Sequence, residues 1–167
     1  MKYIIDSNIF VQSKNFEYSF QYCQIFWDMI LSCAQQNMIC SIKSVHQELN
    51  QKNDELKNWL DDVLLPACPD FFENNFTSMS SYAQVLNWST NHSKYTVAAK
   101  KEFAEYSRAD AHIVAHALEN SYGIITAEKQ DNATKRIKIP NVAHEFNIQT
   151  LTLFDFLKLH AKNNFSL

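Results

Sequence analysis

Four carboxylates stand where a fold with parallel strands would gather them. Asp6 directly follows a short apolar run, and Glu128 comes two residues after Thr126 at the end of another. Asp110 lies in the first turn of a predicted helix, and Glu48 lies on the apolar face of a second one. Two of them also have an ordinary structural explanation. Asp6 can start a turn or cap a helix, and Asp110 suits the helix dipole.

Gathered without cations, these carboxylates would repel one another and raise their own pKa values. Mg²⁺ and Mn²⁺ bind carboxylate and water oxygens and remove that repulsion. Two such ions about 3.5–4 Å apart can ionise a water and stabilise the leaving oxygen of a phosphodiester. The pattern therefore favours metal-dependent hydrolysis, in which Asp6, Glu48, Asp110 and Glu128 are both the catalytic and the metal-binding residues.

Short apolar runs bounded by turn residues predict buried parallel strands at residues 3–5, 38–41, 123–126 and 148–151. In such sheets, ligands bind beyond the carboxyl ends of the strands. Hydrophobic periodicity predicts helices at 18–35, from Ser44 onward, at 54–65, 80–88, 96–106 and 110–119, and after Thr152. Three N-caps are predicted: Ser44 with Gln47 and Thr152 with Asp155 as capping boxes, and Ser107. The middle third shows no strand candidate, so it is expected to form a helical layer or cap.

Helical geometry places two of the acids on packed faces. At about 100° per residue, Ile113 and Val114 lie within about 80° of Asp110, so its carboxylate is expected to point into the packed face. Glu48 shares a face with Val45 and Leu49. Charged side chains in such places are uncommon unless they are paired or bound to something.

Composition limits the classes of function. The 167 residues suit a single domain, and the net charge of −3 leaves no basic surface for nucleic-acid binding by charge alone. A carboxylate site that carries metal is nevertheless locally less negative than its sequence. The single glycine, Gly123, excludes Gly-rich phosphate loops. No membrane span, no signal peptide and no CxxC pair is visible, so a cytoplasmic protein with reduced thiols is expected.

Three segments resemble the PIN-domain family, which includes the VapC-type toxins. They are Ile5-Asp6-Ser7-Asn8-Ile9-Phe10, the run from Arg108 to Ala117, and Ile124-Ile125-Thr126-Ala127-Glu128, together with the helix that carries Glu48. The resemblance spans essentially the whole chain, 1–167. It implies a three-layer α/β/α fold with a central parallel sheet, here with an enlarged helical middle section, and Mg²⁺- or Mn²⁺-dependent cleavage of RNA.

By position, Asp6, Glu48, Asp110 and Glu128 match the acidic metal site of the family, and Asn8 and Thr126 match its supporting polar residues. The family usually has Asp where this chain has Glu128, which is one methylene longer. Such an arm can ligate directly or through water, so the number of ions, one or two, stays open.

Other polar residues have two interpretations each. Lys129, Arg136 and Lys138 form either a solvated loop or a lip that contacts RNA phosphates. His112 and His116 have the spacing of a metal pair, but the helical wheel turns them away from the buried stripe and predicts a solvent-facing position. Among the aromatic residues, Tyr18, Tyr22 and Phe26 are expected in the core or at an interface with another chain.

The sequence therefore predicts a metal-dependent endoribonuclease, the toxin of a type II toxin–antitoxin pair. RNA, a cognate antitoxin protein and a second copy of the chain are the partners that the resemblance implies. The alternative is a catalytically silent PIN-like module that binds RNA or protein. A phosphatase of the haloacid-dehalogenase type is disfavoured, because it needs a second Asp where this chain has Asn8.

Overall fold

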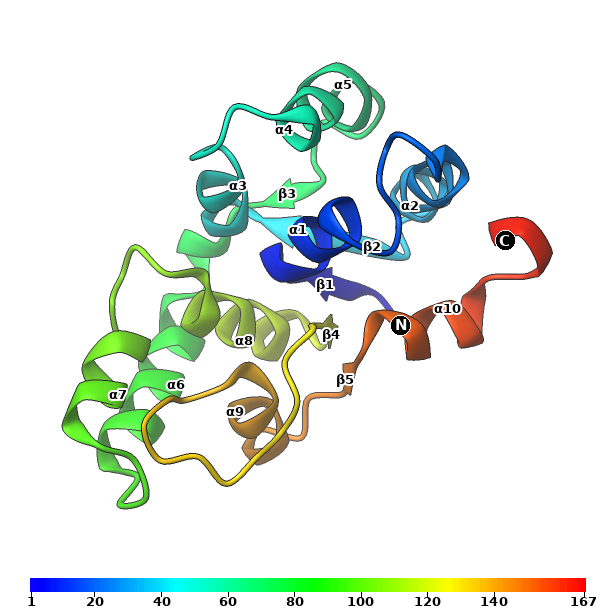
Figure 1. Ribbon diagram of the computed structural model, residues 1–167. Coiled ribbons are helices and arrows are strands. Elements are labelled where there is room, and N and C mark those ends of the chain that lie inside the picture. Colours follow the sequence, from blue (N-terminus) through cyan, green and yellow to red (C-terminus); the bar gives the residue numbers. More distant parts are fainter.

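Five parallel strands form one sheet in the computed structural model, which describes residues 1–167 apart from the side chain of Thr77 (Figure 1). They are β1 (Tyr3–Ile5), β2 (Ile39–Ile42), β3 (Phe72–Glu73), β4 (Gly123–Ile125) and β5 (Thr150–Leu151). Their order in the sheet is β3-β2-β1-β4-β5. The side chains of β1, β2 and β4 are all buried, which accounts for their continuous apolar sequences.

The direction of the chain across the sheet reverses between β1 and β4. The chain runs outward from β1 through β2 to β3, then returns to place β4 on the other side of β1. Ile4 is paired with Cys40 on one side and with Ile124 on the other. Ligands in open parallel sheets bind outside the carboxyl ends of the strands at such a reversal. Asp6 and Thr126 follow these two neighbouring strands.

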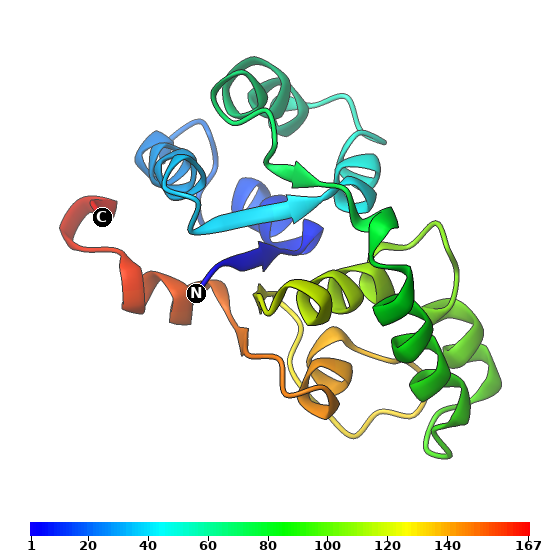
Figure 2. The ribbon, with the colours of Figure 1, turned by 180° about the vertical axis from the view of Figure 1, so that it is seen from behind.

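Helices cover both faces of the sheet and give the three-layer α/β/α fold. The group before β3 comprises α1 (Ser7–Asn15), α2 (Gln24–Gln35), α3 (Lys43–Leu49), α4 (Glu55–Trp59), the π-helix η1 (Leu60–Leu64) and α5 (Leu65–Ala67). The group between β3 and β5 comprises the 3₁₀-helix η2 (Asn75–Thr77), α6 (Met79–Asn91), α7 (Val97–Phe103), α8 (Ala109–Asn120) and α9 (Ile139–Glu145). The chain closes with α10 (Leu153–His160) and the 3₁₀-helix η3 (Asn163–Phe165). Two opposite views show α2, α4 and α5 apart from α6 to α9 (Figures 1 and 2).

α8 is the most enclosed helix of the second group. It packs on β1 and β4 with one face and against α6 and α9 with others. The sheet and its covering helices therefore fix both ends of α8, including the turn that carries Asp110.

In the described part of the chain, no helix is long and apolar enough to cross a membrane.

The helix predicted over 18–35 is wrong in its first part. α2 starts only at Gln24, and a separate helix, α1, follows β1 directly. Tyr18 lies in the intervening loop but stacks on Phe26 with ring centroids 4.1 Å apart, so its apolar character reflects packing rather than helix. Tyr22 is exposed. Tyr18 and Tyr22 therefore precede the helix that contains Phe26, and their helix-like spacing in the sequence arose by chance.

Two predicted N-caps are also wrong, and one strand was not predicted. Ser44 lies inside α3, where its backbone N–H and hydroxyl both bond the side chain of Asn75. Ser107 does not cap α8, whose N-cap is Arg108. β3 lies in the middle third, which was expected to lack strands. It was not predicted because a strand of two residues is too short to show an alternation of apolar and polar residues. α9 follows the basic segment that one interpretation took as a loop.

His112 and His116 are buried, so their predicted solvent-facing position is wrong. The ring of His112 stacks on Tyr82 of α6, with centroids 4.3 Å apart. His116 hydrogen-bonds Glu73 through Nε2 at 2.9 Å and Ser78 through Nδ1 at 3.0 Å. α6 covers the face of α8 that a two-layer arrangement would have left to solvent.

The third predicted cap is confirmed. Thr152 and Asp155 form a complete capping box at the start of α10. This box rests on local sequence, which is why it could be predicted without the fold. The cap of α4 was not predicted: Asp54 accepts hydrogen bonds from the N–H groups of Leu56 and Lys57.

Candidate metal centre

Asp6 lies directly after β1 and is almost completely buried, with 1% exposure. The hydroxyl of Thr126, which follows β4, donates a hydrogen bond to its Oδ2 at 2.9 Å. Burial and, second, the negative charge of Asp110 raise the pKa of Asp6 to about 7, against the opposing effect of the Thr126 hydrogen bond. The carboxyl group at the reversal point between β1 and β4 is therefore costly to ionise.

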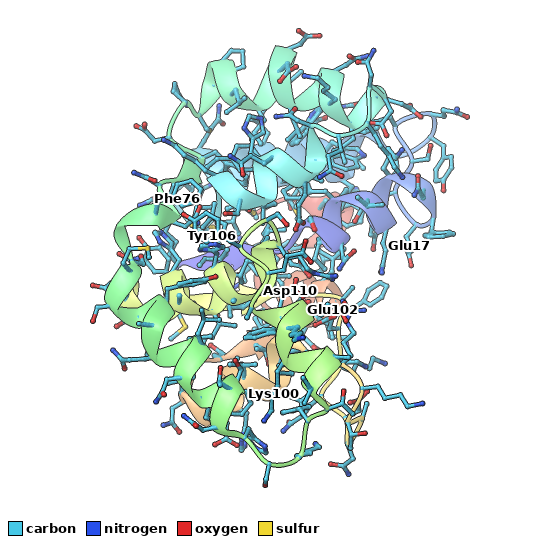
Figure 3. All side chains as sticks on the ribbon, turned by 90° about the vertical axis from the view of Figure 1, so that its left-hand side faces the viewer. Glu17, Phe76, Lys100, Glu102, Tyr106 and Asp110 are labelled. Atoms are coloured by element: carbon cyan, nitrogen blue, oxygen red, sulfur yellow. The ribbon has the colours of Figure 1, made fainter. Side chains whose placement is uncertain are left out.

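Asp110 faces the same place from the first turn of α8. Its pKa is raised to about 6 by burial and then by the charge of Glu128. Among the described residues it makes no hydrogen bond, and its nearest cation is Arg108, with Nη2 3.9 Å from Oδ2. Figure 3 shows Asp110 near the middle of the molecular face that carries α7. Asp110 is thus a largely buried carboxylate without a close partner.

Glu48 reaches the centre from α3, as the apolar face of that helix predicted. Its Oε2 accepts a hydrogen bond from the hydroxyl of Ser7 at 2.8 Å, and the same hydroxyl lies 3.3 Å from Oδ1 of Asp6. Its Oε1 accepts the backbone N–H of Ala109 at 2.9 Å. Glu48 therefore ties α1, α3 and α8 together.

Glu128 follows β4 and is held by three groups. Its backbone N–H donates to the hydroxyl of Thr126 at 3.1 Å. Its Oε2 accepts the N–H of Ile139 at 2.8 Å, and its Oε1 lies 2.9 Å from Nη2 of Arg136. The carboxylate is close enough to Asp6 and Asp110 to raise the pKa of both. All four predicted acids thus belong to one cluster.

A hollow of about 400 Å³ opens at this cluster. Its polar lining comes from four segments of the chain: Ser7 and Asn8; Glu48 and Gln51; Ser107, Arg108 and Asp110; and Arg136. The predicted supporting residue Asn8 is exposed and lines this hollow, whereas Thr126 is buried behind it and holds Asp6. Of the two, Thr126 contacts an acid directly, through its hydrogen bond to Asp6.

The three predicted RNA-contacting residues do not lie together. Arg136 lines the hollow and pairs with Glu128. Lys138 pairs with Asp131, with Nζ 2.5 Å from Oδ2, and Lys129 lines other hollows on the far side of Glu128. The sequence interpretation gave no role to Ser7 or Arg108, although both adjoin the acids that it singled out.

The donor set suits a hard divalent cation. Mg²⁺ prefers oxygen ligands, keeps several waters and is commonly held by one or two carboxylates. Asp6 and Asp110 supply two buried carboxylates whose raised pKa values a cation would lower. Within the described residues, no three side chains of His, Cys, Asp or Glu are grouped so that they could hold a metal ion. Glu48 and Glu128 each accept a backbone N–H as well. The arrangement therefore fits a cation held mainly by two carboxylates and water.

These features define an α/β protein with an acidic centre at the carboxyl edge of a parallel sheet. Over residues 3–165 the chain matches the family described as a domain of unknown function, DUF4411, and it belongs to that family. No curated protein and no solved structure matches it.

Proposed function

We propose that this protein is a PIN-type endoribonuclease that uses Mg²⁺ or Mn²⁺ to hydrolyse RNA phosphodiester bonds. The supporting observation is the pair Asp6 and Asp110, two buried carboxyl groups with raised pKa values at the reversal point of the sheet. Strongly perturbed carboxyl groups in such a place are typical of functional sites. The resemblance to PIN domains adds the substrate class, RNA.

Asp6 and Asp110 would hold the cation. When bound, such an ion supplies Lewis-acid stabilisation of negative charge on a phosphate. Thr126 orients the carboxylate of Asp6, and Ser7 sets its distance from Glu48. Arg108 and Arg136 line the hollow, where their guanidinium groups would bind the RNA backbone. A phosphate bound by Arg136 would compete with Glu128 for that guanidinium and free a carboxylate at the site.

Two substitutions test the proposal. We expect Asp6→Asn and Asp110→Asn to reduce Mn²⁺-dependent cleavage of single-stranded RNA by about 100-fold or more, because each removes a charged ligand. Asp61→Asn is the matched control, since Asp61 pairs only with Lys57 on the surface. Melting curves should show that all three variants fold. Wild-type cleavage rates in both site variants would refute the proposal.

The proposed biological role is that of the toxin of a type II pair, acting in the cytoplasm and held inactive by an antitoxin protein. A homodimer belongs to the same proposal. Induced expression should then arrest growth, and Asp6→Asn should abolish the arrest. Growth arrest that is equally strong with Asp6→Asn would contradict a toxic nuclease.

A catalytically silent module that binds RNA or protein is the second candidate. The observation in its favour is that Glu48 and Glu128 already have hydrogen-bond and ion-pair partners. Calorimetric titration with Mn²⁺ separates the two functions. The nuclease should bind the ion with an affinity that Asp110→Asn weakens, whereas a silent module should release no binding heat at this site.

A further inference from the structure

A second hollow, of about 380 Å³, lies on the other side of α1 from the acidic centre. Ser7 and Asn8 of α1 line the first hollow, whereas Ile9 and Ser13 line the second. Ala127 also lines it, and this residue sits between Thr126 and Glu128 in the chain. Figure 3 shows Glu17, another lining residue, to the right of Asp110. The second hollow therefore adjoins the acidic centre along the carboxyl edge of the sheet.

Ser13 gives this hollow a polar group without a partner. The residue is 1% exposed, and its hydroxyl has no hydrogen-bond partner among the described residues. A buried hydroxyl left unpaired is unfavourable, because it has lost the hydrogen bonds that water would supply. A Ser that lines a cavity and keeps such a hydroxyl indicates that a ligand or a water completes its hydrogen bonding.

The opposite wall combines an aromatic ring with two cations. Phe154, the second residue of α10, is 53% exposed although it lines the hollow. Lys129 and Lys158 line it too, and both charges act on Asp155 at the start of α10. Aromatic rings beside cationic groups are how proteins bind unpaired bases and the phosphates that join them.

We propose that this hollow binds one unpaired nucleotide of single-stranded RNA, next to the bond that is cleaved. Its base lies against Phe154, its edge bonds the hydroxyl of Ser13, and Lys129 and Lys158 bind its phosphates. That the ligand is RNA rests on the proposed function. That a ligand binds here is argued from the hollow and its lining residues. Since a base inside a duplex cannot enter, the subsite selects single strands.

The test is RNA binding measured without cleavage. Fluorescence anisotropy with a labelled eight-nucleotide RNA in EDTA should show about tenfold weaker binding for Phe154→Ala, the effect expected for one lost base stack. Leu159→Ala is the matched control, because Leu159 is an exposed apolar residue of the same helix that does not line the hollow. Its affinity should stay within about twofold of wild type. Both side chains are exposed, so melting temperatures should be retained.

Two further variants separate the roles. Lys129→Ala should weaken binding of all RNA sequences and flatten its salt dependence, whereas Ser13→Ala should change the preference among eight-nucleotide RNAs of different base. Unchanged affinity in Phe154→Ala and Lys129→Ala would overturn the subsite and leave the hollow to another occupant, such as a partner protein. If wild-type protein cleaves no RNA but Phe154→Ala still loses affinity, the nuclease proposal fails and the subsite stands.

Discussion

Glu48 caps a helix to which it does not belong. Its Oε1 accepts the backbone N–H of Ala109 at 2.9 Å, at the first residue of α8. The side chain of Arg108, the N-cap residue of α8, makes no capping hydrogen bond to the helix, so Glu48 takes that role from α3. A carboxylate at a helix N-terminus is also favoured by the helix dipole. This bond holds the turn that carries Asp110, and so couples the position of one acid to another.

Substitution of Glu48 should separate its structural role from its proposed metal role. Glu48→Ala removes the cap and should lower the free energy of unfolding by about 1–2 kcal/mol. Glu48→Gln keeps an acceptor oxygen and should cost less than about 0.5 kcal/mol, while losing the charge that a cation needs. Urea denaturation measures the first effect and Mn²⁺ calorimetry the second. If Glu48→Gln binds Mn²⁺ as wild type does, Glu48 is a cap only.

The pKa values of Asp6 and Asp110 predict how stability depends on pH in the absence of metal. Both are raised, to about 7 and about 6, from about 3.9 in an unfolded chain. The folded state therefore holds more protons than the unfolded state between about pH 4 and 7. Their contribution to stability is complete below about pH 4 and is lost as the pH rises through 6 and 7. Urea denaturation in EDTA should show this loss between pH 5 and pH 8, opposed in part by His46 and His112, whose pKa values are lowered by burial.

Asp110→Asn is the control for this pH effect, because it removes one of the two charges. It should stabilise the metal-free protein at pH 8 by about 1–2 kcal/mol and flatten the pH dependence. Mn²⁺ should act in the opposite sense to the pH rise, since it binds the ionised carboxylates. Its stabilising effect should be larger at pH 8 than at pH 5.5. A wild-type pH profile in Asp110→Asn would contradict the assignment.

Arg136 lines the hollow and pairs with Glu128, which predicts opposite effects on two ligands. Arg136→Ala removes a positive charge from beside Glu128 and should strengthen Mn²⁺ binding. It should weaken RNA binding and reduce the slope of log affinity against log salt by about one. Lys138→Ala is the matched control, because Lys138 pairs with Asp131 and does not line the hollow. Equal loss of RNA affinity in both variants would argue against a local role for Arg136.

Gly123 is the single glycine of the chain, and packing rather than turn geometry requires it. A Cβ at this position would lie 2.5 Å from Cδ1 of Tyr3, its partner in β1. Tyr3 is buried against Phe156, so its ring has little room to move. Gly123→Ala should therefore cost about 1–3 kcal/mol of stability, measured by urea denaturation.

A second substitution checks that cause. In a Tyr3→Val background the ring is absent, and Gly123→Ala should then cost less than it does in the wild-type chain. Equal costs in the two backgrounds would show that the ring is not the reason for glycine at this position.

Local patterns predicted the parts of the fold that depend on few neighbours. The buried strands at β1, β2 and β4 and the capping box of α10 follow from composition and short spacing. The α1 helix was missed because its hydrophobic period is weak and it begins directly after β1. The burial of His112 was missed because a helical wheel describes a helix with one buried face, and α8 is covered on more than one.

The sequence by itself determined which side chains carry charge and that Asp6 follows a strand, because strand formation and charge are properties of short segments. Only the tertiary structure decided that Asp6 and Thr126 meet, since that contact joins residues 120 positions apart through the pairing of β1 with β4. It also decided that the carboxylates of Glu48 and Glu128 accept hydrogen bonds from the backbone N–H groups of Ala109 and Ile139. Such contacts depend on how separate elements pack, and no local period encodes them.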